Sequence, residues 1–306
     1  MKKIILYIRL YAREVDKPIL AFCTLFTALL VYLNYHDDLE KFLVLKINLP
    51  WPSITGHLVL FLFAFLIPHF LLFLRKNDVS DLPSGYVVCL FAAPLIFALK
   101  MGMGTDWNFS PDPAWNNYWS HILYWPIRVT ILMVILFGFW RTYQPKQSFY
   151  GLTTRNFKFA PYFWMLVIMV PLIAIASMQP DFQQAYPKLK NVLPLPNGAE
   201  PSWFYKLLFE LSYGSDFLAI EVFFRGFLIL GFMKWVGKDA ILPMAVFYCT
   251  IHFGKPMGEC ISSYFGGLLL GIVSYHTRSI YGGLMVHLGI AWLMELGGYL
   301  GNHLQW

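Results

Sequence analysis

The chain has 306 residues, of which 58% are apolar and 13% are charged, with a formal net charge of +6. A typical soluble domain is about 25% charged, so this composition excludes a water-soluble globule of the same size. The 28 Phe, 18 Tyr and 11 Trp exclude an intrinsically disordered chain, because disorder goes with few aromatic residues. The four cysteines form no CxxC pair, so neither a zinc ribbon nor a redox motif is predicted. The composition therefore predicts an integral membrane protein.

The positive charge does not indicate a nucleic-acid partner. The basic residues stand singly between apolar blocks, and neither GxxxxGKS/T nor GxGxxG occurs, so no phosphate-binding loop is predicted. Loop charges that orient a protein in the membrane account for the excess of Lys and Arg. We expect membrane lipid and a membrane-associated peptide or protein as partners, and no nucleic acid.

Residues 1–17 are predicted to form an amphipathic helix on the cytoplasmic membrane surface. Ile4, Ile8 and Tyr11 recur at helical spacing with basic residues between them, which is typical of a helix that lies in the membrane interface. Basic residues from Arg9 onward interrupt the apolar core that a cleavable signal peptide needs. A frayed basic tail is the alternative for this segment.

The rest of the chain predicts an all-α, polytopic transmembrane helix bundle with eight or nine spans. A bilayer core about 30 Å thick takes about 20 mostly apolar residues per helix. Residues 18–200 hold the N-terminal transmembrane helices, and residues 201–306 hold the remaining helices and the motifs described below. The predicted spans are 18–35, 54–74, 84–100, 119–140, 159–178, 207–233, 240–253, 259–276 and 279–300.

The loop charges predict the orientation. With nine spans and a cytoplasmic N-terminus, fourteen Lys and Arg residues fall on the inside and seven on the outside. Cytoplasmic loops carry an excess of Lys and Arg, so this division favours a cytoplasmic N-terminus. We expect the protein in the plasma (inner) membrane.

Three consecutive predicted spans near the C-terminus each carry a group capable of catalysis. Glu221 and Arg225 lie four residues apart in AIEVFFRGFLILGF, so they share one helix face. His252 ends VFYCTIHFGKP, and His287 lies near the middle of SIYGGLMVHLGIAWLMEL. An ionisable group inside a membrane is costly, so each of these side chains needs either a partner or a function.

Structural and functional interpretations of these groups both stay open. Glu221 and Arg225 can form an intrahelical ion pair that neutralises both charges, and His252 can be an interfacial residue. In the functional interpretation, Glu221 and His252 draw a proton from a water molecule, while His287 donates a hydrogen bond to the oxyanion. Alternatively, the acid and the two imidazoles bind Zn²⁺ as a His₂Glu site, although HExxH is absent. We favour metal-free hydrolysis without a cofactor and keep zinc as the alternative.

In this order, the motifs resemble those of the CPBP family of intramembrane proteases, which includes the type II CAAX prenyl endopeptidases and bacteriocin-processing proteins. The likeness covers about residues 203–300. Glu221 and Arg225 match the second Glu and the Arg of the family's EExxxR motif. His252 ends an FxxxH motif in which Tyr replaces Phe, and His287 matches the last His. The resemblance implies a membrane endopeptidase in which the first His helps to activate water, the last His holds the oxyanion, and the second Glu pairs with Arg.

Two departures fall on positions that the family uses for catalysis. Ile220 stands at the first Glu of EExxxR, and Ala291 stands at the Asn four residues after the last His. In the prenyl endopeptidases that first Glu is thought to be the base. Either Glu221 has taken over this role, or the chain is an inactive member that acts as a membrane scaffold or binding protein. Prenylated CAAX substrates are implied by the family alone. With Glu221 as the single acid of this motif, the chain resembles a single-Glu variant of the family. Three further residues are second-tier candidates for the site of that variant: Lys255, Glu259 and Arg278.

Overall fold

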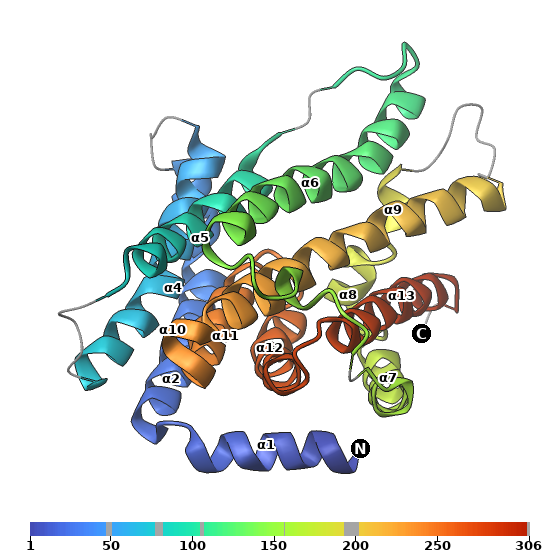
Figure 1. The fold of residues 1–306 in the computed structure, drawn as a ribbon. Coiled ribbons are helices and arrows are strands. Elements are labelled where there is room, and N and C mark those ends of the chain that lie inside the picture. Colours follow the sequence, from blue (N-terminus) through green and yellow to red (C-terminus); the bar gives the residue numbers. More distant parts are fainter. Residues whose placement is uncertain (47–50, 77–81, 105–106, 156, 193–201, 305–306) are drawn as a thin grey trace. The chain divides into compact units, whose positions relative to one another are not determined.

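The computed structural model describes residues 1–46, 51–76, 82–104, 107–155, 157–192 and 202–304. Every regular element in these ranges is a helix (Figure 1), as the composition predicted. The chain divides into two compact units that are interleaved along the sequence. Unit 1 comprises Met1–Met103, Leu136–Phe157 and Val222–Ile280, and unit 2 comprises Gly104–Ile135, Lys158–Glu221 and Tyr281–Trp306.

Five helices make up most of unit 1: α2 (Lys17–Asp37), α4 (Pro52–Lys76), α5 (Ser84–Gly102), α11 (Ile241–Thr250) and α12 (Met257–Thr277). All ten residues of α11 are buried, because this short helix packs against α2, α4 and α12. Aromatic rings fill the space around it. The Phe247 ring lies 4.9 Å from the Phe61 ring and 5.3 Å from the Phe224 ring, measured between centroids. This aromatic core holds the helix in which the FxxxH-like motif begins, and His252 lies in the turn that follows.

Shorter elements connect the long helices of unit 1: α3 (Leu39–Lys41), η1 (Phe42–Lys46), η2 (Phe149–Gly151), η5 (Val222–Gly231), α10 (Met233–Val236) and η6 (Gly237–Ala240). The 3₁₀ turn η2 packs closely on the π-helix η5. A Cβ atom on Gly226 would lie 2.6 Å from the Tyr150 carbonyl oxygen, so this approach requires glycine.

The N-terminal residues form helix α1 (Lys2–Glu14), which packs against α12 (Figure 1). Ile4 and Tyr11 are buried, and the Tyr7 ring stacks on the imidazole of His276 with 4.7 Å between centroids. Lys2 and its basic neighbours are exposed. The location of this helix at the membrane surface stays a prediction.

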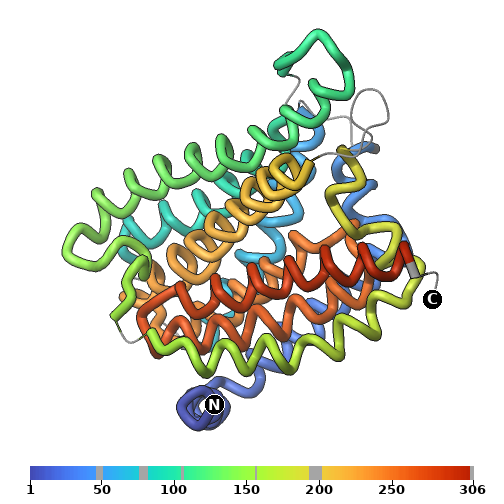
Figure 2. Tube along the Cα trace, turned by 90° about the vertical axis from the view of Figure 1, so that its right-hand side faces the viewer, coloured from blue at the N-terminus to red at the C-terminus, as the bar shows by residue number. Residues whose placement is uncertain are grey.

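The main helices of unit 2 are α7 (Phe159–Ala176), α8 (Pro180–Ala185), η3 (Lys188–Val192), α9 (Trp203–Glu221) and α13 (Tyr281–Leu304). Helix α7 runs beside α13 (Figure 2), and α9 packs against α13 as well. Small residues bring α7 close to α13, since a Cβ atom on Gly289 would lie 2.7 Å from the Leu166 side chain. The long helix α6 (Pro113–Tyr143) contributes its first part to unit 2 and its last part to unit 1.

Seven helices in the described residues are long and apolar enough to cross a membrane: α2, α4, α5, α6, α7, α12 and α13. They match seven of the nine predicted spans. The predicted span 207–233 is occupied by α9 and η5, where Glu210, Asp216 and Glu221 lower the hydropathy. The predicted span 240–253 contains α11, whose ten residues are fewer than the about 20 that a bilayer takes.

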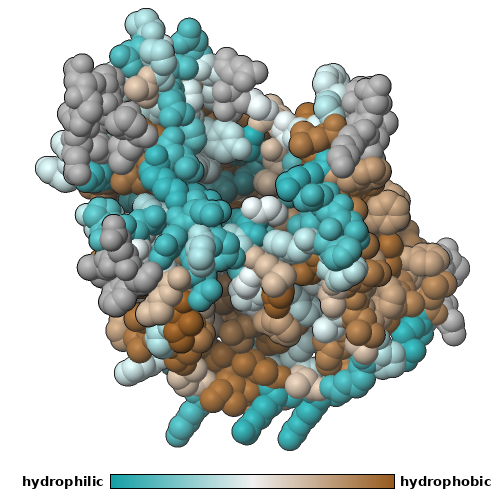
Figure 3. Space-filling view, turned by 180° about the vertical axis from the view of Figure 1, so that it is seen from behind, coloured by the Kyte–Doolittle hydropathy of each residue, from teal (hydrophilic) through white to brown (hydrophobic). Residues whose placement is uncertain are grey.

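The chain is an integral membrane protein. Its candidate spans expose large apolar side chains such as Phe63, Phe91 and Val134, and Figure 3 shows broad hydrophobic surface in brown on one face of the molecule. Such surface needs lipid or another apolar covering. The identity of the membrane and the side of the N-terminus stay predictions.

Candidate active site

Glu221 and Arg225 lie where α9 continues into the π-helix η5. All ten residues of η5 are buried. A π-helical segment is rare and frequently accompanies a functional site. Both side chains are 0% exposed. Because a buried charge is costly unless polar or aromatic groups surround it, the contacts of these two groups decide what they can do.

In unit 2, Glu221 forms a hydrogen bond with His287. The Nδ1 atom of His287, on α13, lies 3.0 Å from Oε1 of Glu221, at the end of α9. The His287 side chain is 13% exposed. An ionised Glu221 carboxylate would accept this hydrogen bond from an Nδ1 atom that carries the proton.

The spacing of residues on α9 explains why this contact forms. Gly214, Phe217 and Glu221 are three and four residues apart, so they lie on one face of the helix. This face meets α13: a Cβ atom on Gly214 would lie 3.2 Å from the Leu288 side chain. The Phe217 ring stands edge-on to the imidazole of His287, with 4.7 Å between centroids. Glycine permits the close approach, and the phenyl ring holds the imidazole in place.

In unit 1, the ring of Tyr248 contacts both Arg225 and His252. The guanidinium carbon of Arg225 lies 4.2 Å from the ring centroid, a cation–π contact in a buried environment. The His252 imidazole is 4.8 Å from the same ring, and its Nδ1 donates a hydrogen bond to the Tyr248 carbonyl oxygen at 2.9 Å. A carbonyl only accepts, so Nδ1 of His252 carries a proton.

The second-tier candidates divide between two places. Nζ of Lys255 lies 2.7 Å from Oε1 of Glu259, so these two side chains form an ion pair. The backbone carbonyl of Lys255 accepts a hydrogen bond from the Tyr35 hydroxyl at 2.5 Å. Arg278 lines a different pocket, in which its guanidinium contacts the Met233 sulfur. The roles predicted for these three residues in a single-Glu site stay predictions.

Two features next to the motifs were not predicted from the sequence. Tyr248 was identified only as a substitution for Phe, although its ring links Arg225 to His252. The neighbouring Cys249 is buried with its Sγ 3.8 Å from that of Cys260. These cysteines are eleven residues apart, and no spacing rule signals such a contact.

A zinc site was the alternative for the acid and the two imidazoles. Within the described ranges, no group of three His, Cys, Asp or Glu side chains gathers closely enough to hold a metal ion. His252 and His287 each use Nδ1 for a hydrogen bond, and zinc-bound imidazoles also make a hydrogen bond through the ring nitrogen that does not bind the metal. Glu221 serves as the acceptor for His287 in this arrangement. The zinc alternative stays a prediction, and no step below is assigned to zinc.

Residues 207–293 match the family model described as Type II CAAX prenyl endopeptidase Rce1-like. The matched range contains Glu221, Arg225, His252 and His287. This match confirms the family resemblance predicted from the motifs. No curated protein and no solved structure matches the chain significantly.

Proposed function

Residues 207–293 belong to the type II CAAX prenyl endopeptidase family, and from this premise we propose that the chain is a membrane-embedded endopeptidase that cleaves a peptide bond with an activated water molecule. The family match supports the class of a CAAX prenyl protease-like membrane hydrolase. The observation that carries the finer proposal is the hydrogen bond between the fully buried Glu221 and His287.

The Glu221–His287 pair has the chemistry of a general base. A carboxylate that accepts from one ring nitrogen fixes the tautomer, and the opposite nitrogen is then ready to take a proton. As the water oxygen attacks the peptide carbonyl carbon, its proton moves to Nε2 of His287, and the Glu221 carboxylate stabilises the imidazolium. The imidazolium then gives this proton to the leaving amine nitrogen as the C–N bond breaks.

His252 is the second imidazole of the proposed mechanism. The motif order predicts that His252 and Glu221 activate the water and that His287 binds the oxyanion, whereas the Glu221–His287 bond favours His287 as the base. Glutamine separates the two assignments, because its amide donates a hydrogen bond but cannot take a proton. Gln at the oxyanion-binding position therefore retains part of the activity, and Gln at the position of the base abolishes it. Arg225 keeps its proposed role of orienting Glu221 by electrostatic attraction.

The proposal is tested by cleavage assays on the purified full-length chain in proteoliposomes. Two substrates are compared: a membrane-inserted peptide and a prenylated peptide with a C-terminal CAAX sequence. Removal of the general base lowers the rate by about 10²–10⁴-fold, and we expect a loss of this size for the single variants Glu221→Gln and His287→Gln. The same loss in His252→Gln, with partial activity in His287→Gln, would instead assign the base to His252. His69→Gln is the matched control, since His69 is a buried imidazole outside the matched range that contacts the Tyr86 hydroxyl. Wild-type rates in the Glu221→Gln and both motif His variants would refute the mechanism.

Ile220 and Ala291 support a second candidate function, that of a catalytically inactive membrane scaffold or binding protein. Ala291 is 3% exposed on α13, one turn after His287, and its methyl group offers no hydrogen bond where the family has an amide. For a scaffold, we expect no cleavage of either substrate by the wild type. Ile220→Glu then restores activity if the rest of the site is intact. Cleavage by the unmodified chain would exclude this alternative.

A further inference from the structure

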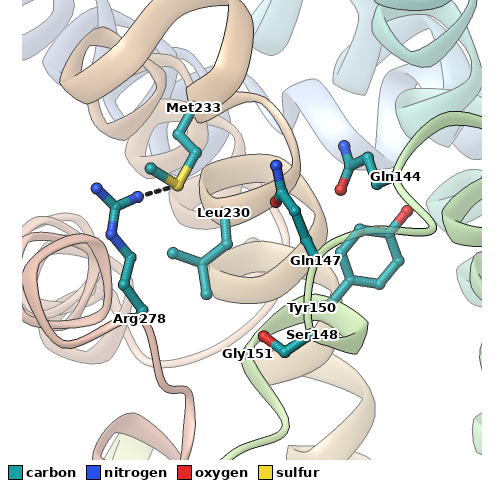
Figure 4. Close-up of a pocket in the computed structure, with 8 residues that line it drawn as sticks. All are labelled: Gln144, Gln147, Ser148, Tyr150, Gly151, Leu230, Met233 and Arg278. Carbon is teal, nitrogen blue, oxygen red and sulfur yellow. Dashed lines mark hydrogen bonds between the residues drawn. The ribbon is translucent and has the colours of Figure 1, made fainter. Parts of the chain in front are cut away.

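A pocket in unit 1 with both polar and apolar lining groups is lined by none of the motif residues Glu221, His252 and His287 (Figure 4). Its volume is about 330 Å³. Figure 4 shows Arg278 on one side of Leu230 and the carboxamide of Gln147 on the other. The pocket thus joins the loop after α6 to the end of α12.

Backbone hydrogen bonds fix the position of Arg278 at this pocket. Arg278 follows the last residue of α12 and has a φ of 58°, in the left-handed region. Its backbone N–H donates to the Ser274 carbonyl oxygen at 2.9 Å, which closes the helix. Two residues later, the N–H of Ile280 donates to the Gly151 carbonyl oxygen at 3.0 Å. The start of this side chain is therefore held between α12 and the η2 turn.

The guanidinium of Arg278 meets no oxygen acceptor in the described part of the chain. Its hydrogen bond goes to the Met233 sulfur, which is a weak acceptor. The guanidinium carbon also lies 4.8 Å from the centroid of the Tyr275 ring. A guanidinium presents five N–H donors in a planar fork that matches the oxygens of a phosphate. At this pocket most of that donor capacity is available to a ligand.

The other lining groups supply neutral donors. Gln144 is buried, and its Nε2 donates to the Gly231 carbonyl oxygen at 2.6 Å. Gln147 and Ser148 are exposed and add an amide and a hydroxyl group. Burial raises the pKa of the Tyr150 phenol, which therefore stays protonated and neutral. The lining groups thus include one guanidinium and several neutral donors but no acidic residue. This combination suits an anion.

The pocket lies where two candidate spans end. Helix α6 ends at Tyr143, immediately before Gln144, and α12 ends at Thr277, immediately before Arg278. The ends of a membrane-spanning helix lie at the depth of the polar headgroups, where a phospholipid carries its phosphate. The basic helix α1 packs against the same α12, so further positive charge belongs to this unit.

We propose that this pocket binds a phosphate group, with the Arg278 guanidinium as the charged donor and Gln147 and Ser148 as neutral donors. A phospholipid headgroup and a free phosphate ion share this chemistry. The depth of the pocket favours the headgroup as the source.

The test measures the thermal unfolding of the purified full-length chain in a maltoside detergent, because a ligand that binds the folded state raises Tm. Three probes are titrated: dioleoylphosphatidylglycerol, a phosphate-free galactolipid, and sodium phosphate against sodium chloride of equal ionic strength. Arg278→Asn removes the charge while tolerating the left-handed backbone. Arg141→Ala is the matched control, since Arg141 is an exposed Arg at the end of α6 that does not line the pocket.

We expect phosphatidylglycerol to raise Tm more than the galactolipid does. Arg278→Asn weakens the apparent affinity by about tenfold or more, because a hydrogen-bonded charge is lost, and Arg141→Ala leaves it unchanged. The same pattern with sodium phosphate alone assigns the site to free phosphate. Gln147→Leu gives a second measurement that does not depend on the backbone at Arg278, and it weakens binding in the same direction. Two results would overturn the proposal. One is equal stabilisation by both lipids with none by sodium phosphate. The other is an equal loss of apparent affinity in Arg278→Asn and Arg141→Ala.

Discussion

The contact between Glu221 and His287 is measurable as a coupling free energy in a double-mutant cycle. His287→Phe keeps a ring against Phe217 but removes the donor, and Glu221→Leu removes the acceptor. A hydrogen bond to a charged group contributes about 1.5–3 kcal/mol to stability. With Nδ1 and Oε1 3.0 Å apart and the acid 0% exposed, we expect a coupling of about 2 kcal/mol between the two substitutions.

The free energies of unfolding of the wild type, both single variants and the double variant come from reversible denaturation in mixed micelles, followed by Trp fluorescence. The cycle cancels the other contacts of each side chain, so it isolates the pair. Glu221→Gln is the matched control, because its amide oxygen still accepts from Nδ1. A neutral hydrogen bond is about half as strong, so the coupling with His287→Phe falls to about 1 kcal/mol. A coupling of less than about 0.5 kcal/mol between Glu221→Leu and His287→Phe would refute the reasoning.

Three further predictions concern the surroundings of the site. Tyr248→Leu lowers the free energy of unfolding by about 2 kcal/mol more than Tyr248→Phe does. Both variants lose the hydroxyl, but only Leu removes the ring that contacts the buried Arg225 guanidinium. Equal losses of stability in the two variants would contradict this prediction. Gly226→Ala lowers the free energy of unfolding by about 1–3 kcal/mol, since its Cβ would meet backbone atoms of Tyr150. Gly258→Ala is the control in the same denaturation assay: its Cβ would meet nothing within 4 Å, so we expect no loss of stability. A zinc chelator leaves the peptide-cleavage rate unchanged, and a loss that added Zn²⁺ restores would instead support the His₂Glu alternative.

Most of the fold was predictable because a bilayer restricts what an apolar segment can do. With no water to satisfy the backbone, a run of about 20 apolar residues must be a helix, and seven predicted spans have such helices. Hydropathy does not distinguish a helix buried in protein from one buried in lipid, and this explains the difference at α11. The π-helix η5 was not predicted, because its wider turn comes from packing and leaves no period in the sequence.

The motifs selected candidate side chains but did not predict that Glu221 contacts His287. Helical spacing reports neighbours three or four residues apart, and so it drew attention to Arg225 as a partner of Glu221. The bond from Glu221 to His287 joins residues 66 positions apart, and only the packing of α9 against α13 brings them together. Arg278 was a second-tier candidate in the sequence, yet its surroundings depend on how the residues after α12 contact η2.

The loss of the family's first Glu has a consequence for the one that remains. A chain with two acids in this motif can use one as the base and the other as the counterion of the Arg, but this chain has only Glu221 for both tasks. The Tyr248 ring stabilises the buried Arg225 guanidinium through its π face. In the proposed mechanism, Glu221 orients His287, and His287 takes the proton in place of the missing acid. In this arrangement the single-Glu motif and the aromatic ring at Tyr248 depend on each other, and the loss of cleavage in Tyr248→Leu should exceed that in Tyr248→Phe.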